Sequence, residues 1–272
     1  MAGLFFLLAL FILLYASVFR DLALDWLAND NYSHGWFIPL LSGVIIYNKR
    51  QALKNISIRS ADIGLPILLT GLLLLIVGTI GFEFFIQRVS LLVVLAGLIL
   101  FLLGRQFFHQ LLLPLVYLIF MIPLPAIIWN RLAFPLQITS SLLTEQIVSL
   151  AGIPVLREGN VLYLANTSLE VIDACSGLRS LITMFALAGA LAMFSHLSTP
   201  GKWLLFFLAA PIAMLVNIIR LIITVLLATN FGPDTAHGFL HEFSGVTVYI
   251  LGLLLLFSVK KWLAGRAKME RL

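Results

Sequence analysis

Apolar segments about as long as a membrane-spanning helix recur along the whole chain, and they constrain its fold more than any other feature. A helix needs about 20 consecutive, mostly apolar residues to cross a bilayer. Eight segments approach that length, and the second of them is short and contains Gly and Pro: 2–19, 36–47, 63–81, 89–103, 107–129, 174–194, 203–229 and 246–262. We therefore predict an all-α polytopic membrane protein with about eight transmembrane helices.

The composition excludes a soluble globular protein. Hydrophobic residues make up 61% of the 272 residues and charged residues only 11%, with a mean hydropathy of +1.09. Soluble proteins are about half apolar and about a quarter charged. The net charge of +5 does not indicate nucleic-acid binding, because the basic residues lie at the ends of apolar segments. The expected partner of this surface is the lipid bilayer.

The distribution of basic residues predicts the orientation. No basic residue precedes the first apolar segment and no clear small-residue cleavage site follows it, which favours an uncleaved first helix. With a cytoplasmic N-terminus, only Arg20, Arg88, Arg131 and Arg157 fall in outer loops. The positive-inside rule then places both termini in the cytoplasm. The inner loops and the tail hold Lys49, Arg50, Lys54, Arg59, Arg105, Lys202, Lys260, Lys261, Arg266, Lys268 and Arg271.

One long outer segment, about 130–173, separates the fifth and sixth predicted spans. Residues 131–150 mix apolar and hydroxyl side chains and predict a helix lying along the interface. The period then changes, and 161–164 and 168–172 predict two short strands around a turn. We find no long repeat or flexible linker, so residues 1–272 are predicted to form a single transmembrane domain with a cytoplasmic tail at about 263–272.

This topology brings three reactive side chains to the outer membrane face. Cys175 lies at the start of the sixth span, Arg220 lies within the seventh, and His241 lies just before the eighth. As the chain's single cysteine, Cys175 excludes internal disulfides and cysteine-based metal sites. No phosphate-binding loop and no His/Asp/Glu cluster with metal-ligand spacing is present. We therefore predict neither a cofactor nor a metal.

A lone cysteine in a membrane helix is usually a small packing residue. Cys175 differs because Asp173, Ser176 and Gly177 surround it at a helix start. A helix N-terminus lowers the pKa of a thiol and favours the reactive thiolate. Gly177 would let a substrate backbone approach closely.

Two arginines and two histidines remain candidates. Burying Arg220 among apolar neighbours costs roughly 2.5–3.5 kcal/mol, and such residues usually face a functional interior, although snorkelling to the interface is the alternative. Asn217 shares its helix face, whereas Arg179 shares the face of Cys175. His237 competes with His241. Glu242 is a further candidate, because its carboxylate could orient the imidazole of either histidine.

These groups allow acyl transfer. A thiolate attacks a peptide carbonyl to give an acyl-enzyme, a histidine carries the proton, and an arginine stabilises the oxyanion. The rival hypothesis is a non-enzymatic transporter or assembly component of polysaccharide export, in which Arg220 and Asn217 line a polar pathway. A transporter predicts internal repeats and discontinuous helices in both halves, and we find no convincing repeat.

Several stretches resemble the exosortase/archaeosortase family of membrane cysteine transpeptidases. Individually they are weak, but in this order on eight predicted spans they are specific. They are 31–35 (NYSHG) with 38–40 (IPL), 120–125 (FMIPLP), 157–161 (REGNV) with 169–181 (LEVIDACSGLRSL), 217–220 (NIIR) and 241–245 (HEFSG). Asp173 stands where the family more often has Glu.

The resemblance implies roles for these residues. Cys175 would be the nucleophile. Arg220 would be the catalytic arginine, because it lies in the family's Asn-x-x-Arg pattern. His241 would be the third member of the catalytic set. Substrates would be exported proteins ending in a Pro-Glu-Pro-type motif, a membrane helix and a basic tail. The site would lie at the periplasmic face of a bacterial inner membrane, with a link to exopolysaccharide or biofilm export.

Overall fold

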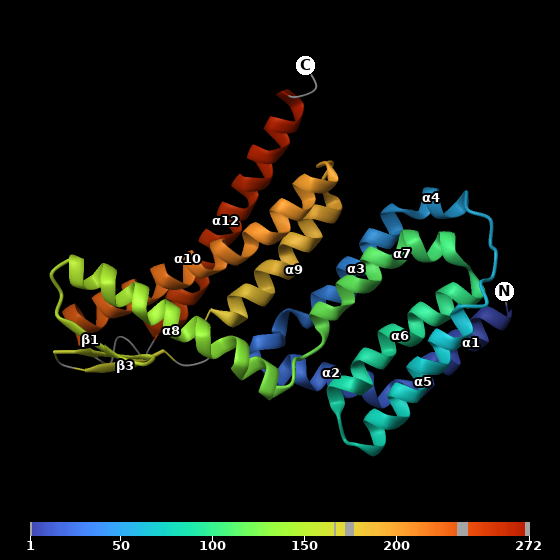
Figure 1. Ribbon diagram of the computed structural model, residues 1–272, viewed down its shortest axis with the longest axis horizontal. Helices are drawn as coiled ribbons and strands as arrows, with labels where there is room; N and C mark the ends of the chain where they lie inside the picture. Colours follow the sequence, from blue (N-terminus) through green and yellow to red (C-terminus); the bar gives the residue numbers. More distant parts are fainter. Residues whose placement is uncertain (1, 166, 172–176, 233–238, 270–272) are drawn as a thin grey trace. The chain divides into compact units, whose positions relative to one another are not determined.

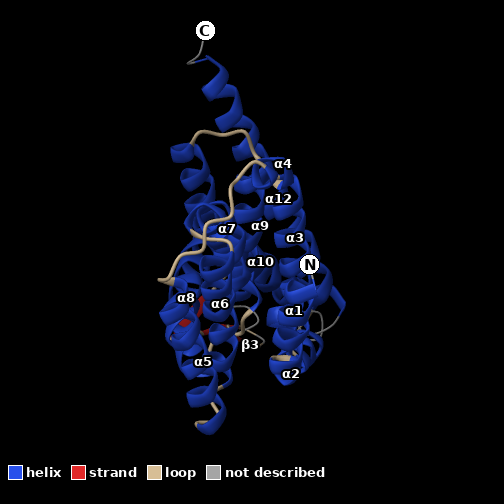
Figure 2. Ribbon diagram, turned by 90° about the vertical axis from the view of Figure 1, so that its right-hand side faces the viewer, coloured by secondary structure: helices blue, strands red, loops and turns tan. Residues whose placement is uncertain are grey.

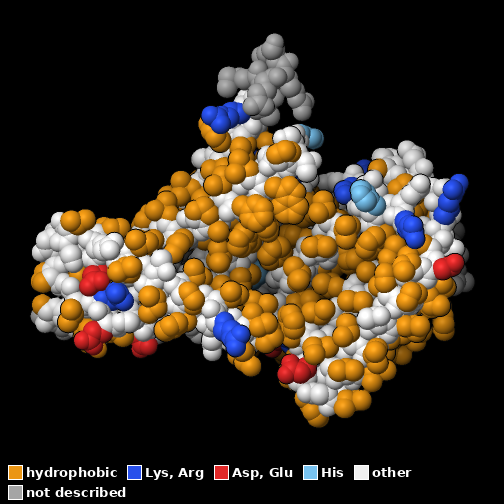
Figure 3. Space-filling view, viewed as in Figure 1, with side chains coloured by type: hydrophobic (Ala, Val, Ile, Leu, Met, Phe, Trp, Pro, Cys, Tyr) orange, Lys and Arg blue, Asp and Glu red, His pale blue; other side chains and the backbone are white. Residues whose placement is uncertain are grey.

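A computed structural model of the protein describes residues 2–165, 167–171, 177–232 and 239–269. It is mostly helical with one small sheet (Figures 1 and 2). The chain divides into two compact units, Met1–Pro125 and Ala126–Leu272. Hydrophobic side chains dominate the surface (Figure 3), as a lipid-facing surface requires. The predicted helical membrane architecture fits this structure.

The first unit is helical throughout. Its α1 and α2 helices bend by 57° at their junction, which lies inside the first predicted span, 2–19. The elements of this unit are α1 (Ala2–Leu14), α2 (Ala16–Ala28), η1 (Asp30–Trp36), α3 (Phe37–Asn48), α4 (Arg50–Lys54), α5 (Gly64–Ile80), α6 (Phe84–Leu102), α7 (Arg105–Tyr117) and η2 (Leu118–Met121).

Helices α5 and α6 form a close hairpin because glycines line their contact. The buried residues of α5 are Gly64, Gly71 and Gly78, one every seven positions. On α6, Gly97 faces the backbone of Leu68. Small residues let membrane helices approach closely, which increases van der Waals contact where the hydrophobic effect contributes little.

Replacing Gly97 by Ala should separate this hairpin. The added Cβ would lie 2.5 Å and 2.6 Å from the backbone nitrogen and Cα of Leu68, so α5 itself would have to move. We expect a loss of about 1–3 kcal/mol, as for other overpacked sites, measured by thermal unfolding of the purified protein. Gly43→Ala on α3 is the matched control, because a Cβ there meets no described atom within 4 Å. An equal loss in both variants would contradict the close packing.

The fifth predicted span, 107–129, is not one helix. Helix α7 and η2 end at Met121, Ile122 is extended (φ −90°, ψ 118°), and α8 begins only at Ala126. Prolines at 123 and 125 account for the break, since a residue before proline avoids the helical region. The helix predicted for 131–150 is therefore the larger part of α8.

The second unit combines helices with the sheet. Antiparallel pairing of β2 with β3, with Val161 opposite Glu170, gives the predicted hairpin, and β1, which the sequence did not reveal, pairs with β2. The elements are α8 (Ala126–Leu150), β1 (Val155–Glu158), β2 (Val161–Leu164), β3 (Ser168–Glu170), α9 (Leu178–Phe194), α10 (Thr199–Phe231) and α12 (Phe239–Met269).

Helices α9, α10 and α12 pack side by side (Figure 1). Their shared core includes Met184 of α9, Leu205 and Val216 of α10, and Leu256 of α12. Gly252 lets α12 approach, because a Cβ there would lie 2.4 Å from the Met184 methyl group. This core packs together α9, α10 and α12, the three helices on which Arg179, Arg220 and His241 lie.

Within the described residues, two helices are long and apolar enough to cross a membrane, Phe84–Leu102 and Thr199–Phe231. The number rises to four if two bent pairs, Phe6–Leu14 with Ala16–Ala28 and Arg105–Met121 with Ala126–Leu150, each form one span. The eight spans and the single domain stay predictions.

Candidate active site

Helix α9 begins directly after the predicted nucleophile. Its N-cap is Gly177, which adopts the left-handed conformation (φ 81°, ψ −5°) that favours glycine. The Gly177 carbonyl accepts a 2.8 Å hydrogen bond from the Leu181 N–H. The sequence placed the start of this span at 174, but a left-handed residue cannot continue a right-handed helix. Cys175 and Ser176 themselves lie outside the described residues.

Asn217 lies on α10 against this turn. Its side chain is 2% exposed, and its Nδ2 donates to Oγ of Ser140 on α8 at 3.3 Å. A Cβ added at Gly177 would lie 3.0 Å from Cγ of Asn217. The absent side chain of Gly177 thus makes room for the Asn217 amide. Arg220 follows three residues later and is partly buried.

The other flank of residues 172–176, which include the predicted nucleophile, contacts the next turn of α10. Val171 is 1% exposed and packs against Leu221. Its N–H donates to the Asn160 carbonyl at 2.9 Å, and Asn160 Nδ2 donates back to the Val171 carbonyl at 3.2 Å. Residues 172–176 are therefore flanked by two contacts on α10, at Leu221 and at Asn217, with Arg220 between these positions in the sequence.

The sheet that leads into this segment is fixed to α8 and α10. Glu145 of α8 accepts hydrogen bonds from the backbone and from Nε of Arg157, both at 3.1 Å, and Ser141 donates to the Gly159 carbonyl at 3.2 Å. An apolar cluster joins the three elements beneath the sheet: Val148 of α8, Leu162 and Leu169 of the strands, and Val225 and Ala228 of α10. This packing fixes the position of Val171 against α10.

The remaining predicted residues lie at the starts of two helices. Arg179 is in the first turn of α9 and is partly buried. His241 and Glu242 are in the first turn of α12, which begins earlier than the predicted start at 246. Their side chains, and all of His237, lie outside the described part of the chain. The structure thus brings Gly177, Asn217 and the Arg220 turn together.

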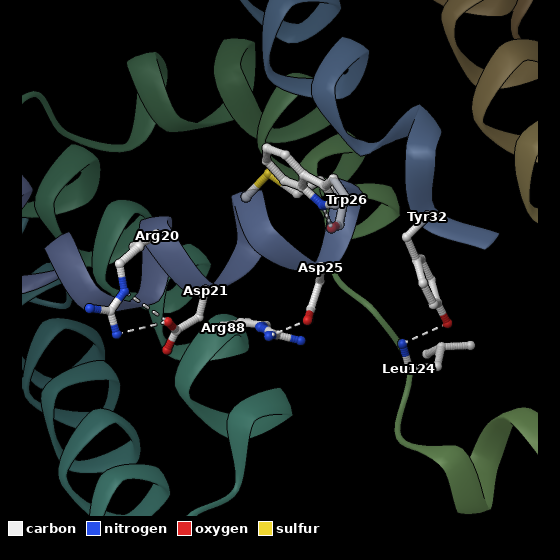
Figure 4. A network of polar contacts seen from close by, with 8 residues as sticks. Arg20, Asp21, Asp25, Trp26, Tyr32, Arg88 and Leu124 are labelled. Carbon is white, nitrogen blue, oxygen red and sulfur yellow. Dashed lines mark hydrogen bonds and ion pairs between the residues drawn. The ribbon is translucent and has the colours of Figure 1, made fainter. Parts of the chain in front are cut away.

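In the first unit, two hydrogen bonds join stretches of the chain that are distant in sequence. The Leu124 N–H donates to the Tyr32 hydroxyl at 3.0 Å, and Trp26 Nε1 donates to the Met121 carbonyl at 2.9 Å (Figure 4). Burial raises the pKa of the Tyr32 phenol, and the Leu124 N–H opposes this shift. The ring of His34 lies 6.3 Å from that of Tyr32.

The first unit also contains a half-buried ion pair that sequence reasoning missed. Arg88, treated above as an outer-loop residue, lies within α6 and is only 7% exposed. It pairs with Asp25 of α2 at 2.5 Å (Figure 4). A charge at the edge of an apolar segment, with an acid at the edge of another, is the signal that could have identified the pair.

The family model for transmembrane exosortases matches residues 26–258. The chain belongs to the transmembrane exosortase family. Comparison with curated proteins and with solved structures yielded no match. The family match extends over both compact units of this exosortase, from Trp26 in α2 to Ser258 in α12. It therefore includes the Tyr32–Leu124 contact as well as every predicted site residue.

Proposed function

We propose that this exosortase is a membrane-embedded thiol protease and transpeptidase with Cys175 as its nucleophile. Exosortases are in general cysteine transpeptidases, and Cys175 is the chain's one cysteine. The observation that carries the proposal is the pair of contacts on either side of residues 172–176. Val171 lies against Leu221 and Gly177 against Asn217, which favours a thiol near the Arg220 turn.

The proposed reaction is acyl transfer in two steps. The Cys175 thiolate adds to the scissile carbonyl, and the tetrahedral intermediate collapses as the C–N bond breaks and His241 protonates the departing amine. This leaves the exported protein as a thioester. An acceptor amine or water then attacks the thioester, His241 takes the acceptor's proton, and the thiolate is regenerated.

Arg220 is the proposed oxyanion stabiliser. A guanidinium presents several donors in a rigid fork and stays charged at all physiological pH values. In a water-poor site its attraction for a developing oxyanion is stronger than in solution. Ser176 and Arg179 are proposed to support the nucleophile turn, and Glu242 to orient the His241 imidazole.

The proposed substrates are exported proteins whose C-terminus carries a Pro-Glu-Pro-type motif, a membrane helix and a basic tail. A basic tail remains cytoplasmic for the same reason as the enzyme's own basic loops. The substrate helix would then present its motif at the periplasmic face of the inner membrane, the level proposed for Cys175, with both enzyme termini cytoplasmic. A role in exopolysaccharide or biofilm export forms part of this proposal.

The rival hypothesis of a polar transport pathway has weaker support. Asn217 was its second lining residue, yet its side chain is 2% exposed. Its amide hydrogen-bonds Ser140 and fills the space left by Gly177. A pathway residue should instead face an open, hydrated channel. The packing of Asn217 therefore favours the enzyme.

A reporter assay tests the proposed function. A secreted reporter carrying the motif, helix and basic tail is co-expressed with this exosortase, and its intact mass is measured. We expect the tail to be lost, and any added mass would identify the acceptor. A matched reporter with Ala-Ala-Ala in place of the motif should keep its tail. A motif-bearing reporter that stays uncut would count against transpeptidation and favour the polar pathway.

A further inference from the structure

The inward face of α8 is polar, although the protein is embedded in lipid. Its buried residues include Gln137, Ser140, Ser141 and Thr144, none more than 7% exposed. Burying a hydroxyl or amide in an apolar environment is unfavourable unless a hydrogen bond compensates. A stripe of such groups on a helix of the second unit therefore calls for a partner of matching chemistry.

Ser140 has such a partner, and the contact continues to α9. Ser140 accepts from Asn217 of α10 at 3.3 Å. The Asn217 side chain in turn lies against Gly177, where an added Cβ would be 3.0–3.2 Å from its Cγ, Nδ2 and Cβ. The contact thus runs from α8 through α10 to the N-cap of α9.

This contact reaches both parts of the proposed active site. Asn217 precedes Arg220 by three residues on one helix face, and Gly177 follows Cys175 by two residues. We propose that Asn217, oriented by Ser140, is a positioning residue that holds the first turn of α9 against the Arg220 turn of α10. This inference rests on the proposed function, because it concerns the geometry of that same site.

The expected consequence is electrostatic. The N-terminal end of α9 carries a partial positive charge from the aligned peptide dipoles, which stabilises a nearby thiolate. If Asn217 no longer supports Gly177, that turn can shift away from the thiol, and the thiolate loses stabilisation. The pKa of Cys175 should then rise, and less thiolate would be present at neutral pH. Because the Asn217 side chain is only 2% exposed, we do not expect it to bind the substrate directly, and KM should not change.

The single cysteine makes this measurable on the full-length protein. The rate of Cys175 alkylation by iodoacetamide is followed by intact mass between pH 5 and 10, a range chosen to bracket about pH 8.5, the ordinary thiol pKa. For Ser140→Ala we expect a midpoint about 0.3–0.7 pH unit higher and alkylation at neutral pH about two- to fivefold slower, as for other helix-terminus effects. Asn217→Ala should change both in the same direction.

The matched control is Thr144→Val on the same buried face. The Thr144 hydroxyl is fully buried and has no hydrogen-bond partner among the described residues, so this isosteric change removes a hydroxyl but leaves the hydrogen bond between Asn217 and Ser140 in place. We expect wild-type alkylation and kcat. If Thr144→Val shifts the midpoint as much as Ser140→Ala, or if Ser140→Ala shifts nothing, the positioning role is wrong.

Reporter turnover separates this inference from the proposed function. Ser140→Ala should lower kcat by the same two- to fivefold factor with KM unchanged. An inactive Cys175→Ala enzyme together with a normal Ser140→Ala enzyme would overturn only the role of Asn217. A Cys175→Ala enzyme that still cuts the reporter would instead overturn the proposed function itself.

Discussion

Replacing Cys175 by Ala is expected to abolish processing of the reporter. Without the thiol no thioester can form, and no second cysteine can substitute, because the chain contains only one. In proteases that use a covalent intermediate, loss of the nucleophile lowers kcat by up to roughly 10⁶-fold. We therefore expect the reporter mass to stay that of the uncut protein, with no acyl-enzyme detected.

Cys175→Ser sharpens this test. Serine keeps the size and polarity of the side chain but lacks the low pKa that makes a thiolate available. It should fold and accumulate in the membrane as the wild type does, yet remain inactive. The measurement is membrane yield, thermal stability and reporter mass for both variants. Near-wild-type cleavage by Cys175→Ser would show that the reaction does not need a thiolate, and equal cleavage by Cys175→Ala would direct attention to another nucleophile.

The periodicity of the sequence predicts much of the second unit. A short run of β-branched and aromatic residues at 161–164, followed by turn residues, predicts β2, and an apolar run with few charges predicts α10. The first strand was missed because Val155–Glu158 includes two charged residues that interrupt an apolar pattern; one of them, Arg157, is paired with Glu145 of α8. That pairing joins residues 12 apart in sequence and leaves no local signal.

The first unit shows what length counting overlooks. A window of 107–129 is apolar enough for a span, but Pro123 and Pro125 end the helix, a local rule that should have outweighed hydropathy. Likewise, Gly64, Gly71 and Gly78 recur every seven residues, and this spacing marks the α5–α6 contact. Both signals were present in the sequence and concern backbone geometry, which hydropathy does not measure.

For the site, the sequence predicts which helices pack together but not the side-chain contacts that hold them in place. Asn217 shares a face with Arg220 by simple helical spacing. Its contact with Gly177 depends on a left-handed N-cap and on two helices packed side by side, and its hydrogen bond reaches Ser140, 77 residues away. No pattern in one sequence encodes such a pairing, so α8 could not be predicted to contribute.

Arg220→Ala should lower kcat by about 10²–10³-fold, the usual effect of removing an oxyanion donor, or about 2.7–4 kcal/mol of transition-state stabilisation. Arg220 lies on the turn of α10 between Asn217 and Leu221, the two residues that contact the flanks of the nucleophile segment. Arg220→Lys should restore activity only in part, because an ammonium keeps the charge but lacks the planar fork.

Two further arginines make the Arg220 result specific. Arg20→Ala is the control, since its side chain is 74% exposed and pairs only with the adjacent Asp21 among the described residues; it should leave kcat unchanged. Arg179→Ala tests the alternative arginine, and single-turnover cleavage with thioester detection compares all four variants. If Arg220 stabilises the oxyanion, its loss should slow thioester formation more than the loss of Arg179. The reverse order would transfer that role to Arg179, whose place in the first turn of α9 is four residues after the thiol.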